Sequence, residues 1–327
     1  MDRPCVQVPR TEGEAARTRL AEGGLLDRDY QITVEDKHIY LPVGDPDAVP
    51  PDLTVVEHPV ETRRRQVAPA DQLGWEPTYE RVGEVVVLDE ADPDRARAAA
   101  TAVMESDVPA TTVVNQASKV EGEFRVREFN VLAGDSTETV HREYGHEFLL
   151  DLAEVYFSPR LATERRRVSE QVCEGEYIVD MFAGVGPFAV PMAARGATVL
   201  AVDKNPVAVR YCRENARRNG VDDQMESVEA DVSDAAYERP GDADRLVMNL
   251  PHSADEFLDA AVTLAGDDCT VHLYDIQHKD DPFGPAVAAV EAAVEGTGYD
   301  VAVVGKRVVR SYAPHEVNVR VDLCLRR

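Results

Sequence analysis

The stretch with the clearest potential for chemistry covers residues 180–188, with the sequence DMFAGVGPF. An apolar run, 176–179, precedes it, and residues 188–196 predict a short helix that ends at a glycine. A strand, a glycine turn and a helix open nucleotide-type binding folds, because glycine lets a ligand approach the backbone and the helix N-terminus faces the crevice. We therefore expect a ligand near Gly184 and Gly186. Any doubly wound α/β domain with a glycine-rich first turn gives the same pattern, so this stretch alone does not decide the function.

Two further polar groups follow predicted strands. Asp203 ends the apolar run 198–202, and a carboxylate there suits a ribose diol because it accepts two hydroxyl hydrogen bonds. The segment Asn249–Pro251 follows another predicted strand, 245–248. Ligands of open α/β sheets bind at the carboxyl ends of the strands, so both groups are expected at the ligand crevice.

Charge gives a mixed indication about partners. The chain of 327 residues has 61 acidic and 35 basic side chains and a net charge of -26, and only five of the basic residues are lysines. Such an acidic chain argues against nucleic-acid binding, unless the acidic excess is an adaptation to a salty cytosol. We favour a halophilic protein, because the excess is spread along the chain rather than gathered in a tail. The arginine clusters Arg63–Arg65 and Arg165–Arg167 are then the candidate phosphate contacts.

Cysteine usage and hydropathy indicate a cytoplasmic protein. The five cysteines are widely spaced without a CxxC pair, which favours reduced thiols and argues against a metal site. The N-terminus lacks the apolar core of a signal peptide, and glycines interrupt the longest apolar stretch, 181–202, so no membrane span is expected.

Three domains are expected from the order of predicted elements. Residues 1–66 predict a small unit with a helix and a hairpin, and residues 67–150 a compact α+β domain. In residues 151–327 strands and helices alternate regularly, which predicts an α/β fold with a mostly parallel, Rossmann-like sheet and a late antiparallel pair of strands. These boundaries carry an uncertainty of several residues.

Three local expectations concern candidate site residues. The alternation of polar and apolar residues in 121–129 predicts a strand with Arg125 and Arg127 on one face. Thr163 suits the N-cap of a charged helix with Glu164 in its first turn. Asp231 is expected at the end of a strand, 226–232.

Six motifs in order along the chain together resemble the archaeal and eukaryotic tRNA (guanine-N1)-methyltransferase family. They are Phe124–Glu128, Val155–Leu161, Glu164–Arg165, Asp180–Phe188, Asn249–Pro251 and Ser311–Pro314. The resemblance runs along the whole chain. It implies a class I methyltransferase fold, S-adenosylmethionine as cofactor and, as substrate, the guanine that lies 3′ of the anticodon of tRNA. The segment from Asn249 is also similar to the N/D-P-P-Y/F motif of methyltransferases that act on planar nitrogens, with Leu and His in place of Pro and the aromatic residue.

The resemblance implies four catalytic residues. Glu164 matches a general base that removes the N1 proton of guanine, and Arg125 a cation that stabilises the charge that develops on O6. Asn249 matches the residue that holds the base edge, and Pro251 shapes its loop. Arg127 is the alternative to Arg125. Without the resemblance, the plain interpretation of Arg125 is an ion-paired surface residue, for example with Glu143.

The resemblance also implies a cofactor site. Asp203 would bind the ribose, Asp231 the adenine amino group, and Arg165 the methionine carboxylate, although a solvated helix charge is an equal interpretation of Arg165. Tyr156 and Phe182 also match positions near the cofactor, and packing in the core is the alternative interpretation of both aromatic side chains. The full set is Tyr156, Arg165, Asp180, Phe182, Gly184, Gly186, Asp203, Lys204, Asp231, Val232 and Asn249.

The implied partner is tRNA, with the anticodon loop at the active site and the elbow contacted by the small N-terminal unit. No metal is implied, and a monomer is expected. Three alternatives stay open: a related transferase of tricyclic guanosine biosynthesis that acts on the same nucleotide, an RNA-binding module without activity, and an N-methyltransferase of small molecules or proteins. The last would leave residues 1–150 without a role.

Overall fold

The structure is a computed structural model that describes residues 1–63, 66–118, 122 and 124–327. It separates into two compact units, Met1–Ala68 and Pro69–Arg327. The larger unit contains a four-stranded sheet, a two-stranded hairpin and a seven-stranded sheet. In the part of the chain that the structure describes, no helix is both long and apolar enough to cross a membrane.

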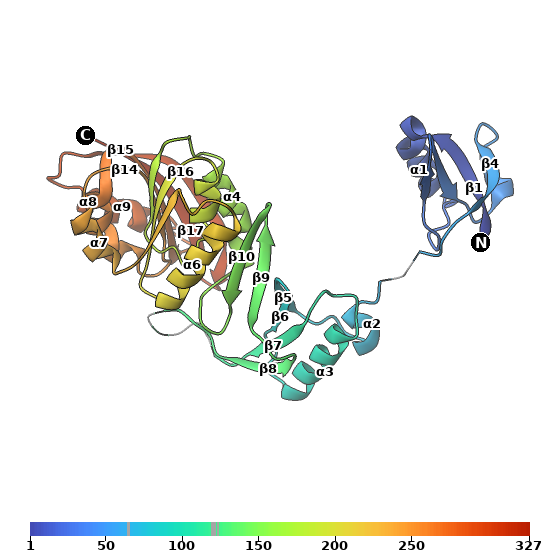
Figure 1. Ribbon diagram of the computed structural model, residues 1–327, viewed down its shortest axis with the longest axis horizontal. Coiled ribbons are helices and arrows are strands. Elements are labelled where there is room, and N and C mark those ends of the chain that lie inside the picture. Colours follow the sequence, from blue (N-terminus) through green and yellow to red (C-terminus); the bar gives the residue numbers. More distant parts are fainter. Residues whose placement is uncertain (64–65, 119–121, 123) are drawn as a thin grey trace. The chain divides into compact units, whose positions relative to one another are not determined.

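The first unit is an antiparallel sheet packed on one helix (Figure 1). Leu20 of the helix and Leu41 of the sheet are fully buried in its core. The predicted helix and hairpin are both confirmed. In spatial order the strands are β2 (Thr33–Glu35), β3 (His38–Pro42), β1 (Asp2–Pro9) and β4 (Thr54–Pro59), and the helices are η1 (Arg10–Glu12), α1 (Gly13–Glu22) and η2 (Pro46–Ala48).

The second unit begins with a four-stranded mixed sheet. Helix α3 covers its valine-rich strands, and Asp92 caps this helix by accepting hydrogen bonds from the N–H groups of Asp94 and Arg95. In spatial order the strands are β5 (Tyr79–Val82), β6 (Val85–Leu88), β7 (Thr112–Gln116) and β8 (Phe129–Ala133), and the helices are α2 (Pro69–Leu73) and α3 (Pro93–Met104).

The strand predicted over 121–129 is wrong. Arg125 lies in a turn, with a φ of 54° and its N–H donating to the carbonyl of Gly122 at 3.2 Å. The strand begins only at Phe129, so Arg125 and Arg127 do not share a strand face. The alternating pattern misled because Gly122 and Arg125 both have positive φ, 72° and 54°, which is incompatible with a regular strand; residues 121 and 123 lie outside the described part of the chain.

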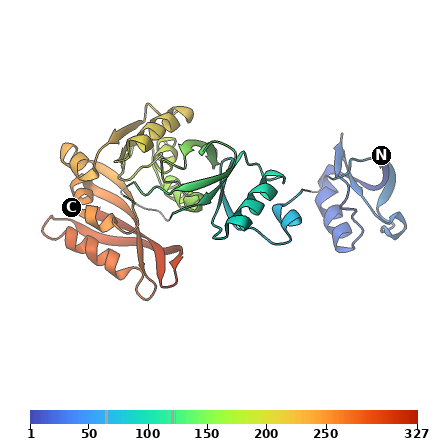
Figure 2. The same cartoon turned by 90° about the horizontal axis from the view of Figure 1, so that it is seen from below.

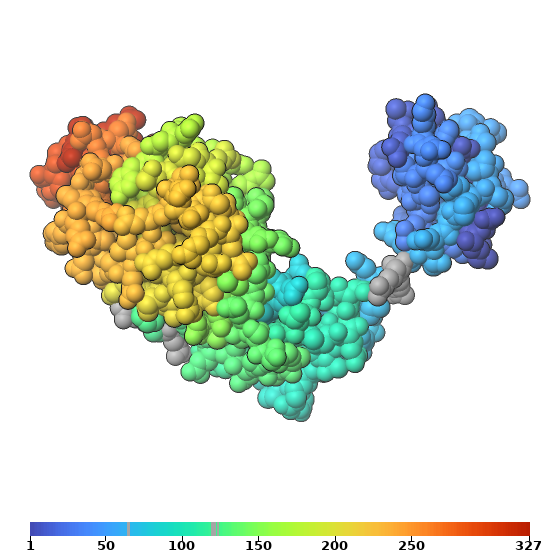
Figure 3. Space-filling view, viewed as in Figure 1, coloured from blue at the N-terminus to red at the C-terminus, as the bar shows by residue number. Residues whose placement is uncertain are grey.

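A hairpin of β9 (Glu138–Glu143) and β10 (His146–Asp151) follows. Two asparagines hold this hairpin, Asn215 of helix α6 (Pro206–Arg218) and Asn219 directly after it. Asn215 bonds the N–H and carbonyl of Leu149, and Asn219 those of Glu147. Figure 3 shows that residues of about 70 to 150, drawn in cyan and green, form a continuous surface with the residues that follow.

The seven-stranded sheet confirms the predicted class I α/β fold. Its first five strands in space are parallel, and the last two form the predicted antiparallel pair. In spatial order they are β13 (Met225–Glu229), β12 (Thr198–Asp203), β11 (Tyr177–Asp180), β14 (Ala243–Asn249), β15 (Ala265–His278), β17 (Glu316–Arg326) and β16 (Asp300–Ala313).

Helices cover both faces of this sheet. One core cluster packs α4, α5 and α6 against one face, and a second packs α7, α8 and α9 against the other. In Figure 2, α6 (yellow) and α9 (red-orange) lie on opposite sides of the orange strands. The helices are η3 (Pro159–Leu161), α4 (Ala162–Ser169), α5 (Ala189–Ala193), α6 (Pro206–Arg218), α7 (Val232–Glu238), η4 (Ala254–Phe257), α8 (Leu258–Leu264) and α9 (Gly284–Ala293).

Candidate active site

The candidate site lies at the carboxyl ends of β11, β12 and β14. The chain leaves β11 at Asp180 and turns through Gly184 and Gly186, whose φ values are 55° and 88°. A Cβ placed on Gly184 meets no atom within 4 Å, so the loop borders open space there. A Cβ on Gly186 would lie 3.0 Å from Sγ of Cys212 on α6. Glycine at 186 therefore serves the packing of the loop on α6, and Gly184 borders the open space that a close ligand approach requires.

Asp180 carries a buried carboxyl group. It is 1% exposed, and both oxygens lack a regular hydrogen bond within the described residues. Burial raises the pKa of Asp180 to about 7; the N–H of Phe182 opposes this shift, the negative charge of Asp203 adds to it, and the N–H of Ala189 opposes it. Unpaired buried oxygens are costly, and they mark a position where a ligand donor would be stabilising.

Asp203 ends β12 beside the glycine loop. One carboxylate oxygen accepts the N–H of Gly184 at 2.7 Å, and the other accepts the N–H of Asn205 at 2.8 Å. Burial raises the pKa of Asp203, and these two hydrogen bonds oppose the rise. Each oxygen keeps lone pairs for a further donor, which a ribose diol requires.

The residues expected around the adenine lie at the start of α7. Asp231 is the N-cap of this helix rather than part of a strand, and it accepts the N–H of Ser233 at 2.8 Å. Burial works against ionisation, but this hydrogen bond and Lys204, 3.1 Å away, hold the pKa of Asp231 below its usual value. Val232 is buried next to it. The ring of Phe182 packs edge-on against Phe257 at 5.0 Å, so its packing is at least partly structural.

Glu164 lies in the first turn of α4 and is only 4% exposed. The predicted N-cap, Thr163, is wrong, because the helix begins after Leu161 without a side-chain cap. Oε2 of Glu164 accepts Nε–H of Arg167 at 2.9 Å and the hydroxyl of Tyr274 at 3.3 Å, and a guanidinium nitrogen of Arg320 is 3.7 Å away.

Sheet register places Asn249 beside this group. Asn249 is the last residue of β14 and pairs with Tyr274 on β15, which in turn pairs with Arg320 on β17. Oδ1 of Asn249 is buried and has no partner among the described residues. Asp180 pairs with Val247 on the same strand, so the loop, Asn249 and the anchor of Glu164 all lie on the face that α4 covers.

Two tyrosines, Tyr156 and Tyr312, lie within electrostatic reach of Arg125. Burial lowers the pKa of Arg125, and the hydroxyls of Tyr156 and Tyr312 act in the opposite direction, which places all three side chains close together. The ring of Tyr312 packs edge-on against His252 at 5.0 Å, one residue after Pro251. Tyr156 and Tyr312 are 39% and 49% exposed, respectively, so their rings are available to a large ligand.

Arg165 differs from its expected place. Its guanidinium donates to both oxygens of Glu143, at 2.8 and 2.5 Å, and to the carbonyl of Ser158 at 2.9 Å, and the residue is 3% exposed. It is neither a solvated helix charge nor an open cation for a ligand carboxylate. Glu143, which sequence analysis considered as a partner for Arg125, pairs with Arg165 instead.

Glu164 is held by Arg167, Tyr274 and Arg320, and Asp322 holds the two arginines in turn. The sequence indicated Arg167 only as a candidate phosphate contact, and it did not indicate the other three, which come from β15 and β17. One pattern could have indicated them: in the otherwise apolar strand β17, polar residues recur at 318, 320 and 322, which puts a polar row on one face.

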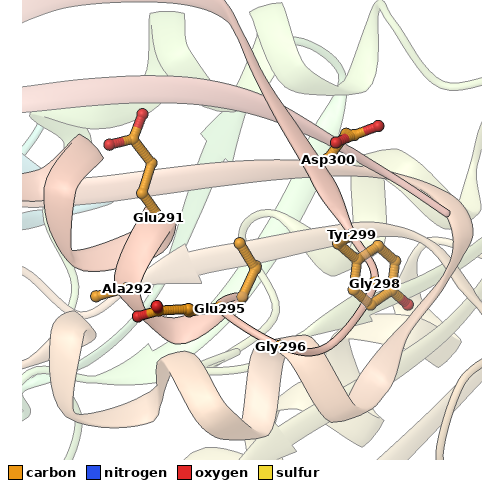
Figure 4. Close-up of a pocket in the computed structure, with 8 residues that line it drawn as sticks. Glu291, Ala292, Glu295, Gly296, Gly298, Tyr299 and Asp300 are labelled. Carbon is orange, nitrogen blue, oxygen red and sulfur yellow. The ribbon is translucent and has the colours of Figure 1, made fainter.

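A separate hollow of about 800 Å³ lies between the end of α9 and the start of β16 (Figure 4). Its lining includes Glu291, Glu295, Tyr299 and Asp300. Asp300 pairs through β17 with the amino-terminal part of β15, so this hollow is at the edge of the sheet opposite the candidate site. Within the described residues, no cluster of His, Cys, Asp or Glu could hold a metal ion.

Comparisons with known proteins agree with this arrangement. The model of the TRM5/TYW2 methyltransferase domain matches residues 139–302. A relative from Pyrococcus abyssi, described as tRNA (guanine(37)-N(1))-methyltransferase Trm5b, is 38% identical over 97% of both chains. The chain belongs to the TRM5/TYW2 methyltransferase family. Two further TRM5/TYW2 models match in front of that domain: the tRNA methyltransferase 5 N-terminal domain over 5–48 and the TYW2 N-terminal domain over 68–137.

Solved structures of the TRM5/TYW2 family are similar to this chain, the Trm5 structures over nearly its whole length and a TYW2 structure over about three quarters of it. The crystal structure of Trm5b from P. abyssi has a TM-score of 0.73 and 36% identity, covering 99% of this chain and 100% of the other. The complex of aTrm5 and tRNALeu has a TM-score of 0.73 and 30% identity, covering 98% and 99%. TYW2 of Methanocaldococcus jannaschii in complex with AdoMet has a TM-score of 0.62 and 27% identity, covering 76% of this chain and 100% of the other.

Proposed function

We infer that this chain is an S-adenosylmethionine-dependent tRNA (guanine(37)-N1)-methyltransferase, which methylates N1 of the guanine 3′ of the anticodon. The observation that carries the inference is the buried carboxylate of Glu164, held on one oxygen beside Asn249 at the carboxyl end of the sheet. The family membership and the Trm5b relatives, which match over nearly the full length, support the same activity.

The residues present fit S-adenosylmethionine, which supplies the methyl group. In the part of the chain that the structure describes, Asp180 has two buried oxygens without a regular partner, Gly184 borders open space, and Asp203 keeps lone pairs for a ribose. We propose that Asp203 holds the ribose, that Asp231 and the backbone groups of Lys204 and Val232 hold the adenine, and that the region of Asp180 binds the amino-acid part. Tyr156 and Phe182 are proposed to line the same site.

Glu164 is proposed as the base. At neutral pH the N1 of guanine carries a proton and is a poor nucleophile, so a carboxylate that removes the proton makes N1 reactive. Negative charge then develops on O6, and the guanidinium of Arg125 is proposed to stabilise it. The free Oδ1 of Asn249 would accept a hydrogen bond from an N–H of the base edge, while Pro251 shapes the loop that follows.

The proposed partner is tRNA, with a flipped target guanine. The compact unit Met1–Ala68 is proposed to contact the elbow, since a model of the tRNA methyltransferase 5 N-terminal domain matches part of it. We retain the domain division 1–66, 67–150 and 151–327 as a proposal. Of the first arginine cluster, Arg64 and Arg65 lie outside the described residues; in the second, Arg165 is occupied by Glu143. A monomer in a salty cytoplasm remains our proposal for its state and location.

The related transfer of an aminocarboxypropyl group is less well supported. The relatives described as tRNA(Phe) (4-demethylwyosine(37)-C(7)) aminocarboxypropyltransferases match 74% and 75% of this chain, at 32% and 30% identity. The Trm5b relatives match 97% of it. N1 methylation therefore accounts for more of the chain, including its first unit.

The deciding experiment uses purified protein in high salt, labelled S-adenosylmethionine and two unmodified tRNA transcripts. One transcript has guanine 3′ of the anticodon and the other has adenine there. Label on the first alone, recovered as 1-methylguanosine, is the expected result. Label on both transcripts would mean another target nucleotide, and a heavier adduct found by mass analysis would favour the aminocarboxypropyl reaction.

A further inference from the structure

The two oxygens of the Glu164 carboxylate have different surroundings. Oε2 receives all the contacts: Nε–H of Arg167, the hydroxyl of Tyr274 and the more distant guanidinium of Arg320. Oε1 has no hydrogen-bond partner among the residues that the structure describes. One oxygen is thus anchored, and the other is available to receive a proton.

Arg167 is the central anchor. Its Nε donates to Glu164, while its two terminal nitrogens donate to the two oxygens of Asp322 at 3.0 and 3.2 Å. One guanidinium therefore links helix α4, which carries Glu164, to strand β17, where Asp322 lies 155 residues after Arg167 in the sequence. A planar guanidinium can bridge two carboxylates in this way, whereas an ammonium group offers no such fork.

Asp322 in turn is hydrogen-bonded to His272. His272 is fully buried; its Nδ1 is 2.6 Å from Asp322, and its Nε2 is 2.8 Å from Arg245. Arginine can only donate, so Nε2 of His272 accepts, and Nδ1 carries the proton that it donates to Asp322. Burial lowers the pKa of His272; the negative charge of Asp322 opposes this, and the positive charges of Arg245 and Arg167 add to it, so the ring is neutral.

The network of contacts from Glu164 through Arg167, Asp322 and His272 continues to Arg245, which forms an ion pair with Glu176. Arg245 donates to both oxygens of Glu176, at 2.8 and 3.1 Å, and to the carbonyl of Gln171 at 3.2 Å. This network, in which Glu164, Arg245, Arg320 and Asp322 are buried and Arg167 and Glu176 are partly exposed, has three carboxylates against three arginines and is electrically neutral. Buried ion pairs of this kind add little stability compared with apolar packing, so their geometry is the more informative property.

We propose that Arg167 is a positioning residue that fixes Oε2 of Glu164, so that Oε1 is the atom that takes the N1 proton, with Asp322 and His272 holding the Arg167 fork in place. The proposal rests on the proposed function. In the reaction the N1–H bond breaks, its electron pair stays on N1 for the incoming methyl group, and the proton goes to Oε1. Arg167 contacts Oε2 only and acts through Glu164.

The test is a double-mutant cycle of Arg167→Met and Glu164→Gln, with the single-turnover rate of methyl transfer as readout. Arg167→Met is expected to lower this rate about 10- to 100-fold, while the Kd values for S-adenosylmethionine and tRNA change less than about twofold. In the Glu164→Gln background the same change is expected to have no further effect, because the base that Arg167 positions is gone.

The matched control is Arg217→Met. Arg217 also forms an ion pair with a glutamate three residues earlier on its helix, Glu214 at 3.4 Å, but on the exposed side of α6. It should leave the rate unchanged. Tyr274→Phe removes only the hydroxyl that donates to Oε2, so we expect this variant to fold. It should lower the single-turnover rate a few-fold in the wild-type background and leave it unchanged in the Glu164→Gln background.

A purely structural role gives a different pattern. An equal fall of the rate in both backgrounds, or a loss confined to the Kd values, would overturn the proposal, as would a Glu164→Gln enzyme with wild-type rate. If Arg167→Met fails to fold, Tyr274→Phe decides by the same criterion. Failure of the proposed function is distinct, because the wild-type protein would then form no 1-methylguanosine.

Discussion

Asn249 and Tyr274 lie directly opposite each other on the parallel strands β14 and β15, on the face of the sheet that α4 covers. Within the described residues the amide oxygen of Asn249 has no partner, and the hydroxyl of Tyr274 donates to Glu164. Neighbouring strands thus present the group proposed to hold the base edge and an anchor of the proposed base. Their spacing is set by backbone hydrogen bonds of the sheet, which is more rigid than a loop.

Replacing Glu164 by Gln is expected to lower the single-turnover rate of methyl transfer about 10²- to 10⁴-fold, the usual contribution of a general base. Glutamine keeps the shape of the side chain but cannot take a proton. Binding of S-adenosylmethionine, measured by calorimetry, should change little, because Glu164 contacts residues of α4, β15 and β17 and not the glycine loop. A variant with the wild-type rate would exclude Glu164 as the base.

Asp180 is expected to make the stability of the ligand-free protein depend on pH. Its pKa rises from 3.8 to about 7 on folding, so the folded state holds the proton more tightly than the unfolded state. Its favourable contribution is complete below pH 3.8 and is lost as the pH rises through about 7. The full difference corresponds to ~4 kcal/mol of unfolding free energy.

The variant Asp180→Asn removes this titration. Its melting temperature relative to wild type should rise between pH 5 and pH 8 at constant salt, while its affinity for S-adenosylmethionine falls. A difference in melting temperature that is the same at both pH values would contradict a buried carboxyl that titrates near neutrality.

The sequence predicted the parts of the site that depend on local pattern. Glycines between a strand and a helix, and polar residues after apolar runs, placed the loop and the residues 203 and 249 at the carboxyl ends of the strands, where the structure has them. These patterns work because parallel strands place all their carboxyl ends at one edge.

The rest depends on contacts between distant segments. Arg165 and Arg167 are two residues apart on one charged helix. Arg165 is held by Glu143 of the β9–β10 hairpin, whereas Arg167 is held by Asp322 of β17, the last strand of the chain. Helical spacing sends these side chains to different faces, and nothing in the local sequence says what covers each face. The turn at Arg125 was missed because its alternating polarity resembles that of a strand.

Loss of Arg165 is expected to affect stability more than cofactor binding. Arg165→Met would leave the buried carboxylate of Glu143 with only His141, 3.2 Å away, and should lower the unfolding free energy by about 3–5 kcal/mol. The double variant Arg165→Met/Glu143→Leu should recover much of this loss, because apolar packing replaces a buried ion pair well. Denaturant unfolding measures both. A higher Kd for S-adenosylmethionine at unchanged stability would instead support the ligand contact expected from the sequence.

The two glycines of the loop are expected to respond differently to alanine. Both have positive φ, so each substitution strains the backbone by about 1 kcal/mol. Gly184→Ala adds a methyl group in open space, and should mainly weaken binding of S-adenosylmethionine. Gly186→Ala adds one 3.0 Å from Sγ of Cys212 and 3.3 Å from a methyl of Val190, and overpacking of this kind destabilises by a further ~1–3 kcal/mol.

A second substitution separates strain from overpacking. Cys212→Ala removes the sulfur that the new methyl group meets, so it should return part of the stability lost in Gly186→Ala but none of that lost in Gly184→Ala. Melting temperatures of the single and double variants measure this, and calorimetry with S-adenosylmethionine measures binding. Equal destabilisation by the two alanines, without recovery from Cys212→Ala, would mean that backbone strain alone explains why both positions are glycine.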